Sequence, residues 1–251
     1  MQESLAILSS YFSKKKHPND PADAHVVGRT VDGKVKNDEI SYIKPWYDSI
    51  NKLNLKGFIF HDNLSEYFVE QYTTENVNFI KVEDSIYSNN DYRFFCFNDF
   101  LKENKFDYVF HSDASDVTVA QNPIKLIKNN PEISYFACKD SIKLKQFGDY
   151  LSVHDKFNFE DKMMFMLNMD SWDLINMGVI GGAYEDMSNF YSRFVEIRQS
   201  MGVPEFNSDM WLCQYLLRSQ FKDKKFIMGE PVCSEFKQYQ NEREDVYFIH
   251  K

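Results

Sequence analysis

Short apolar runs alternate along the chain with segments in which apolar residues recur at the spacing of one helix face. The runs are rich in aromatic and β-branched residues, which favours strands at 5–8, 57–60, 77–82, 106–110, 133–138, 226–228 and 246–249. Helical spacing or a helix start is found at 39–53, 90–104, 187–201 and from 122 and 207 onward. Most strands run into polar residues. This pattern predicts one α/β domain, a mostly parallel sheet flanked by helices, with ligands above the strand ends.

The segment 106–117 organises the rest of the chain. Its apolar run breaks into two carboxylates, Asp113 and Asp116, three residues apart. Two acids at the end of a buried strand can hold Mg²⁺ or Mn²⁺, which take oxygen ligands and keep positions open for water and phosphate. The alternative is a pair of exposed acids in a turn, because this motif alone is common.

Composition excludes some classes of partner. The chain has 251 residues, and its 23 Phe and 15 Tyr predict an aromatic core. The net charge of −9 argues against non-specific binding to nucleic acid. No run has the length of a membrane span, and the N-terminus lacks the basic region of a signal peptide. We expect a cytoplasmic protein and leave peripheral membrane association open.

The four cysteines, Cys96, Cys138, Cys213 and Cys233, are scattered and form no C-x-x-C pair. We expect them to be small apolar core residues in a reducing compartment.

Two irregular stretches and one glycine-rich strand complete the pattern. The polar stretch 13–37 has the length of a functional or disordered loop. Segment 141–170 is aromatic and of mixed charge, which is typical of an insertion on the acceptor side of a site. Its aromatic residues Tyr150, Phe157 and Phe159 either stack on an acceptor sugar or pack in the protein. Three glycines in 175–182 allow close backbone approach to a ligand, although their spacing is not that of a dinucleotide-binding fingerprint.

These features in this order resemble metal-dependent glycosyltransferases of the glycosyltransferase-A fold. Asp113-Ala-Ser-Asp116-Val, with Asn122-Pro123 just after it, is similar to a D-x-x-D variant of that family's D-x-D motif, and the resemblance covers about 5–250. It implies one Rossmann-like domain, 1–251, that moves a sugar from a nucleoside-diphosphate sugar to a hydroxyl of a glycan acceptor. It further implies Mn²⁺ or Mg²⁺, UDP rather than GDP, and a role in surface polysaccharide or lipooligosaccharide synthesis.

The resemblance also assigns the metal ligands. Asp113 and Asp116 bracket the nucleotide-sugar, with Asp116 the direct ligand, and His250 adds a third ligand. An imidazole beside two carboxylates suits Mn²⁺ better than Mg²⁺. The alternative for His250 is a frayed terminal residue, because only Lys251 follows it.

The remaining assignments concern the donor and the acceptor. Asp209 is placed near the acceptor hydroxyl as a general base, or is a plain N-cap of the helix that follows it. Arg93 is a donor contact or a helix-surface ion pair. Further donor or acceptor contacts implied by the resemblance are Ser9, Tyr11 (stacked on the base), Asp62, Asp113, Lys139, Asp140, Asn176, Gly178 and Lys251.

Three other functions share parts of this pattern. A sugar-1-phosphate nucleotidylyltransferase would carry a Gly-rich phosphate loop after its first strand, where this chain has Ser9-Ser10-Tyr11. A metal-dependent phosphohydrolase with Asp113 as nucleophile would leave 176–182 without a role. A non-enzymatic carbohydrate-binding module would bind glycan without metal or nucleotide.

Overall fold

The computed structural model describes residues 3–15, 30–31, 34–147, 156–203, 206–240 and 242–251. Within them a central sheet has the order β10-β8-β9-β6-β1-β4-β5. Its strands are β1 (Leu5–Tyr11), β4 (Lys56–His61), β5 (Val77–Lys81), β6 (Tyr108–Ser112), β8 (Tyr135–Lys143), β9 (Asp173–Ala183) and β10 (Phe226–Met228). Every pairing in this sheet is parallel except the two made by β9. The predicted α/β class and mostly parallel sheet are confirmed.

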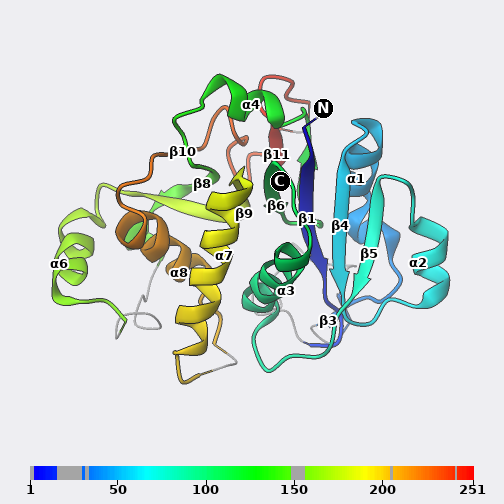
Figure 1. Cartoon of the computed structure of the whole chain (residues 1–251), viewed down its shortest axis with the longest axis horizontal. Coiled ribbons are helices and arrows are strands. Elements are labelled where there is room, and N and C mark those ends of the chain that lie inside the picture. Colours follow the sequence, from blue (N-terminus) through cyan, green and yellow to red (C-terminus); the bar gives the residue numbers. More distant parts are fainter. Residues whose placement is uncertain (1–2, 16–29, 32–33, 148–155, 204–205, 241) are drawn as a thin grey trace.

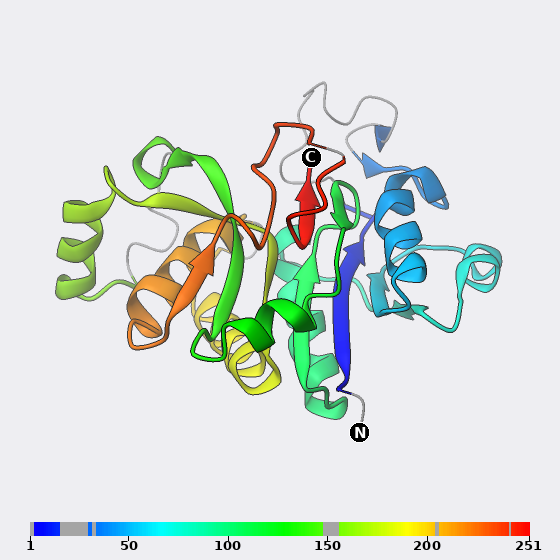
Figure 2. The same ribbon diagram turned by 90° about the horizontal axis from the view of Figure 1, so that it is seen from above.

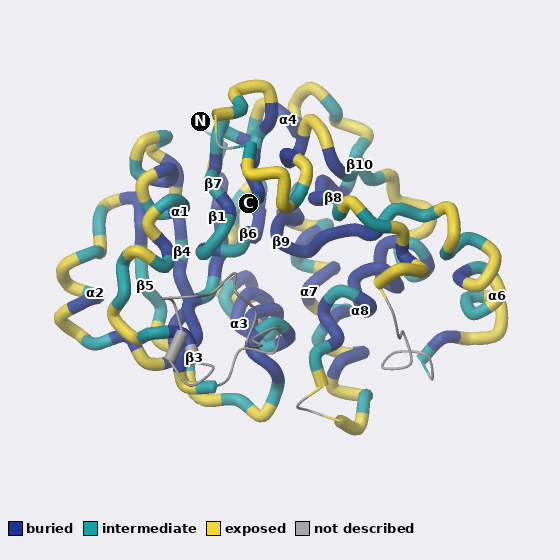
Figure 3. The backbone as a smooth tube through the Cα atoms, turned by 180° about the vertical axis from the view of Figure 1, so that it is seen from behind, coloured by how far each residue is buried: buried dark blue, intermediate teal, exposed yellow. Residues whose placement is uncertain are grey.

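Helices cover both faces of the sheet (Figures 1 and 2). One face packs against α1 (Ile40–Lys52), α2 (Glu66–Tyr72) and α4 (Ile124–Asn129). The other packs against α3 (Asn89–Glu103), α7 (Tyr184–Gln199), α8 (Asp209–Tyr215) and α6 (Phe159–Asn168), which lies farthest from β1. Figure 3 shows that the strands between these layers, β1, β6 and β9 above all, are buried along their length.

Two small antiparallel pairs lie beside the central sheet. β2 (Thr30–Val31) pairs with β3 (Lys34–Val35), and β7 (Val117–Val119) pairs with β11 (Phe248–His250). The second pair packs on the α1 side of the core and brings the C-terminal end of the chain next to the end of β6 (Figure 1). This arrangement places a terminal strand in the middle of the molecule.

The helices predicted from spacing are present, but several begin or end elsewhere. Ser88, not Asn90, caps α3, since its hydroxyl accepts from the backbone N–H of Asp91. α7 begins at Tyr184 and closes at Ser200 rather than at Gly202. At α4, Pro123 takes the N-cap position. Pro45 lies inside α1, which continues past it to Lys52.

The described parts of segment 141–170, residues 141–147 and 156–170, are more regular than expected. β8 continues past Lys139 to Lys143, a 3-10 turn (η2, Leu144–Phe147) follows, and α6 occupies 159–168. Phe157 is buried and its ring stacks on that of Tyr215, with 4.5 Å between the ring centroids. It therefore packs in the core and does not present its face to a sugar. Phe159 is exposed on α6, whereas Tyr150, like much of the polar stretch 13–37, lies outside the described residues.

All four cysteines are buried, as expected of core residues, but two of them are bonded to each other, which was not predicted. Cys138 on β8 and Cys233 in the loop before β11 form a disulfide, while Cys96 and Cys213 are free and buried. The two bonded residues are 95 positions apart, and no spacing rule connects them in the sequence.

Among the described residues, no helix combines the length and apolar character that a membrane crossing requires.

Candidate active site

A cavity of about 710 Å³ opens above the carboxyl ends of β1 and β6, where β9 begins. Parallel strands present their following loops at one edge of a sheet, and ligands bind there in open α/β folds. Most of the predicted site residues line this cavity: Arg93, Asp113, Asp116, Asp140, Asn176, Gly178, Asp209, His250 and Lys251.

The two acids of the D-x-x-D motif face the cavity from the turn between β6 and β7. The backbone N–H of Asp113 donates to the carbonyl of Gly178 at 2.9 Å, which ties the turn to β9. On the strand before it, the hydroxyl of Ser112 accepts from the indole of Trp46 at 2.8 Å. These contacts hold Asp113 and Asp116 at the cavity wall, and the alternative of a free solvent-facing turn does not apply.

His250 is a buried part of the site and not a frayed terminus. It is 1% exposed, lies opposite Val117 in the β7–β11 pair, and its backbone N–H donates to the Ser234 hydroxyl at 2.9 Å. Its Nε2 is 3.7 Å from Oδ2 of Asp116. Burial disfavours the charged imidazole, but the carboxylates of Asp116 and Asp113 outweigh that effect and raise the pKa of His250.

These three residues fit a divalent cation. The ligand atoms of Asp113, Asp116 and His250 all lie within 4.8 Å of one another. Two carboxylates and one imidazole are a donor set that suits Mn²⁺. Gly178 leaves the space that the imidazole occupies, since a Cβ at this position would lie 2.2 Å from Cε1 of His250. The lack of a side chain at Gly178 therefore makes room for the imidazole of His250.

Arg93 joins two carboxylates beneath the cavity. It lies on α3 with 7% exposure, and its guanidinium pairs with Asp113 and, at 3.1 Å, with Oδ2 of Asp209. It is therefore not a helix-surface ion pair. Because its charge is already shared between two acids, a phosphate would meet it only by competing with them.

Asp209 is the first residue of α8, and Ser208 occupies the N-cap position. The Asp209 carboxyl is 3% exposed, lines the cavity, and its Oδ1 has no hydrogen-bond partner among the described residues. Burial raises the pKa of Asp209 to about 6, although Arg93 acts in the opposite direction. A plain capping role does not account for these properties.

Two residues of β9 form the wall next to β8. The side-chain amide of Asn176 donates to Asp140 at 3.2 Å, and its carbonyl accepts from the backbone N–H of Gly178 at 2.8 Å. Lys139, the neighbour of Asp140, pairs with Asp173 outside the cavity. Lys251 lines the cavity, and its backbone N–H donates to the carbonyl of Asp116.

Three predicted donor contacts are structural in this fold. The Ser9 hydroxyl donates to the carbonyl of Ser112 at 2.6 Å. Tyr11 is fully buried, with its hydroxyl donating to the carbonyl of Lys36, so its ring is not placed to stack on a base. Asp62 accepts two backbone N–H groups from the segment after β1. All three hold the strand ends that frame the cavity.

Many residues of the cavity wall were not singled out in the sequence. Among them are Tyr42 on α1 and Phe236, Lys237 and Tyr239 in the loop before β11. Burial and the charge of Asp116 raise the pKa of Tyr42. The Phe236 ring lies 4.3 Å from the imidazole of His250. Lys237 and Tyr239 have left-handed φ angles of 63° and 51°, a conformation that neither residue type signals.

Comparison with solved structures agrees with this architecture. One similar structure is galactosyltransferase LgtC, solved with donor and acceptor sugar analogs: TM-score 0.53, 11% identity, 98% of this chain and 86% of that one. Another is a glycosyltransferase involved in glycosylation of the major capsid of PBCV-1: TM-score 0.51, 15% identity, 98% of this chain and 92% of that one. The chain has the glycosyltransferase-A fold. No protein-family model and no curated protein matches the sequence.

The glycosyltransferase-A fold thus extends over nearly the whole chain, although the sequence is only 11% and 15% identical to these two structures. A fold hosts many chemistries, so the function has to be argued from the cavity itself.

Proposed function

We propose that this protein transfers a sugar from a nucleoside-diphosphate sugar to a hydroxyl of a glycan acceptor, with a divalent cation as cofactor. One observation carries the proposal. Asp113, Asp116 and His250 come from the end of β6 and from the last strand of the chain, and they meet in one cavity with ligand atoms within 4.8 Å of one another. Because solved glycosyltransferases share this fold, the cluster of these three side chains in the cavity supports a metal site that binds the diphosphate of the donor.

Asp113, Asp116 and His250 would hold the cation, Mn²⁺ in preference to Mg²⁺ because of the imidazole. A cation bound there supplies a Lewis acid that stabilises negative charge on the leaving diphosphate. Lys251 and Lys237 line the same cavity and can add positive charge toward the phosphates. Arg93 contributes indirectly, because it holds Asp113 in place.

The donor nucleotide is proposed to be a uridine diphosphate. The cavity of about 710 Å³ is within the range of roughly 300–1,000 Å³ that suits ligands of this size. Tyr42 and Phe12 line its wall near β1 and offer aromatic faces to a base, the role that Tyr11 cannot fill.

The acceptor is proposed to be a surface polysaccharide or lipooligosaccharide, bound on the β8–β9 side. Asp140 and Asn176 present polar atoms there that can bind sugar hydroxyls. Asp209 lines the same cavity, and one of its carboxylate oxygens has no hydrogen-bond partner among the described residues, so we assign it the general base that takes the acceptor proton.

The test is a transfer assay that follows release of UDP from UDP-sugars in the presence of Mn²⁺. Asp116→Asn should abolish turnover, because a neutral amide no longer completes the cation site, and should leave the melting temperature near that of the parent. Asp99→Asn, which changes an exposed aspartate of α3, is the matched control and should be fully active. Turnover by Asp116→Asn at the parent rate would refute the proposed metal site.

A further inference from the structure

The segment that carries His250 is joined to the central sheet by a covalent bond. Cys138 lies on β8, directly opposite Asn176 of β9 in the sheet register. Cys233 lies in the loop between β10 and β11, and both sulfurs are fully buried. Among the strands of the described structure, β11 pairs with β7 and not with the seven-stranded sheet, so the disulfide links two separately paired parts of the site.

Hydrogen bonds carry this link from Cys233 to His250. Residues 232–234 run beside β11: the backbone N–H of Phe248 donates to the carbonyl of Val232, and that of Ser234 donates to the carbonyl of Phe248. The Ser234 hydroxyl then accepts from the backbone N–H of His250 at 2.9 Å. The segment next to Cys233 is therefore the second edge that holds the three-residue strand β11 in place.

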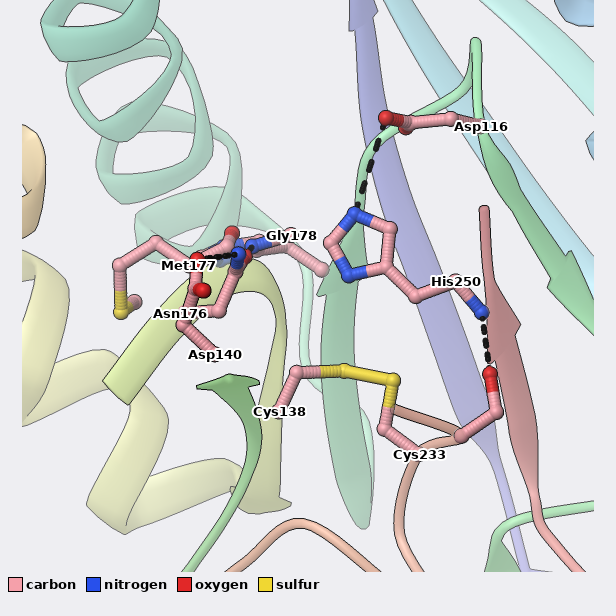
Figure 4. Close-up of a disulfide and its surroundings, with 10 residues drawn as sticks. Asp116, Cys138, Asp140, Asn176, Met177, Gly178, Cys233 and His250 are labelled. Carbon is pink, nitrogen blue, oxygen red and sulfur yellow. Dashed lines mark hydrogen bonds and ion pairs between the residues drawn. A yellow bond between two sulfur atoms is a disulfide. The ribbon is translucent and has the colours of Figure 1, made fainter. Parts of the chain in front are cut away.

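The disulfide also lies beside the imidazole itself. The sulfurs of Cys138 and Cys233 and a ring nitrogen of His250 lie within 4.8 Å of one another. Figure 4 shows the disulfide on the side of the ring away from Asp116. Nδ1 of His250 has no hydrogen-bond partner among the described residues, so on this side packing sets the ring orientation rather than a hydrogen bond.

We propose that the Cys138–Cys233 disulfide positions His250 for the divalent cation, so that reduction of this bond weakens the cation site. The inference rests on the metal role proposed for His250. A dithiol reductant would transfer two electrons and two protons, break the S–S bond to two thiols and itself become a disulfide. Segment 232–234, and His250 with it, would then be held by hydrogen bonds and core packing without a covalent link to β8. Groups that orient a metal-bound histidine typically change metal affinity by about 10- to 100-fold.

The test is a Mn²⁺ titration of the nucleotide-free protein, followed by electron paramagnetic resonance. Cys138→Ala/Cys233→Ala should bind Mn²⁺ about tenfold more weakly than the oxidised parent, or weaker still. Wild-type protein that has been reduced and then freed of reductant should show the same loss, and reoxidation should restore the affinity. Cys96→Ala, which removes a buried free thiol on α3, is the matched control and should bind normally.

A second variant separates positioning from general stabilisation. In a His250→Ala background, removal of the disulfide should no longer change Mn²⁺ affinity, because the residue through which it acts is gone. Equal Mn²⁺ affinity in the oxidised parent, the double-alanine variant and the reduced protein would overturn the inference and leave the proposed function intact. Absence of Mn²⁺ binding by the oxidised parent would instead overturn the metal role itself.

Discussion

The guanidinium of Arg93 couples the metal side of the cavity to the acceptor side. It is buried between Asp113, a proposed cation ligand, and Asp209, the proposed base. A buried cation that pairs with two acids compensates their charge, and its removal leaves uncompensated charge. Arg93 therefore joins the proposed cation ligand and the proposed base in one electrostatic unit.

Asp209 gives a prediction about pH. Burial raises its pKa to about 6, and a general base works only when deprotonated. The transfer rate should therefore rise with pH up to about 6 and level off above it. Asp209→Asn should lower the rate by roughly 100-fold or more and remove this acidic limb.

Nucleotide binding is the control for that variant, because a base that acts on the acceptor should not change donor affinity. Initial rates between pH 5 and 8, with UDP affinity measured alongside, provide the comparison. An unchanged acidic limb in Asp209→Asn would assign the proton transfer to another group.

Among the elements, β9 joins the central sheet to the proposed cation site. Its Gly178 lies against the His250 ring, and an added Cβ would come within 2.2 Å of Cε1. Gly178→Ala should displace the imidazole and weaken Mn²⁺ binding about tenfold or more, as expected when a ligand loses its orientation. The protein should remain folded, since β9 keeps its pairing on both sides.

Gly202→Ala is the matched control for this prediction, because a Cβ there meets no atom within 4 Å among the described residues. Isothermal titration of Mn²⁺ into both variants makes the comparison. If Gly178→Ala binds the metal as well as Gly202→Ala does, the ring of His250 is not a ligand.

Element positions follow from the sequence where the local pattern decides them. The apolar run before Asp113 indicates a strand and the spacing of apolar residues in α3 indicates a helix, and both elements were predicted. The extension of β8 to Lys143 was not, because its polar residues are held by pairing with β9 rather than by their own preference. Cap positions shifted for a similar reason: Ser88 and Asn90 are both good caps, and tertiary contacts choose between them.

The residues of the candidate site were likewise predicted only in part. The acids were proposed from their motif and His250 from the family resemblance; the three side chains lie together in one cavity, and their metal role stays a prediction. Tyr11 was misassigned because the sequence cannot show that its ring turns into the core and its hydroxyl bonds to Lys36. The disulfide and the contact of Phe236 with His250 depend on pairings across long separations, which no local pattern encodes.

At the scale of the whole molecule, a glycosyltransferase-A fold is kept at 11–15% identity to two solved glycosyltransferases. Such divergence is compatible with one fold because core volume and polarity pattern constrain the chain more than individual residues do. Charged groups from distant segments of the chain line the cavity. They come from α3, the end of β6, α8 and β11.

The measurement that tests the central claim most directly is a thermal-shift panel of UDP, GDP, CDP, dTDP and ADP, each with and without Mn²⁺. A ligand that binds only the folded protein raises the melting temperature, and the rise grows with the logarithm of the ratio of its concentration to its dissociation constant. We expect a clear rise with UDP only when Mn²⁺ is present, and no rise for Asp116→Asn. If none of the five nucleotides changes the melting temperature, with or without Mn²⁺, the proposed nucleotide-sugar site is contradicted.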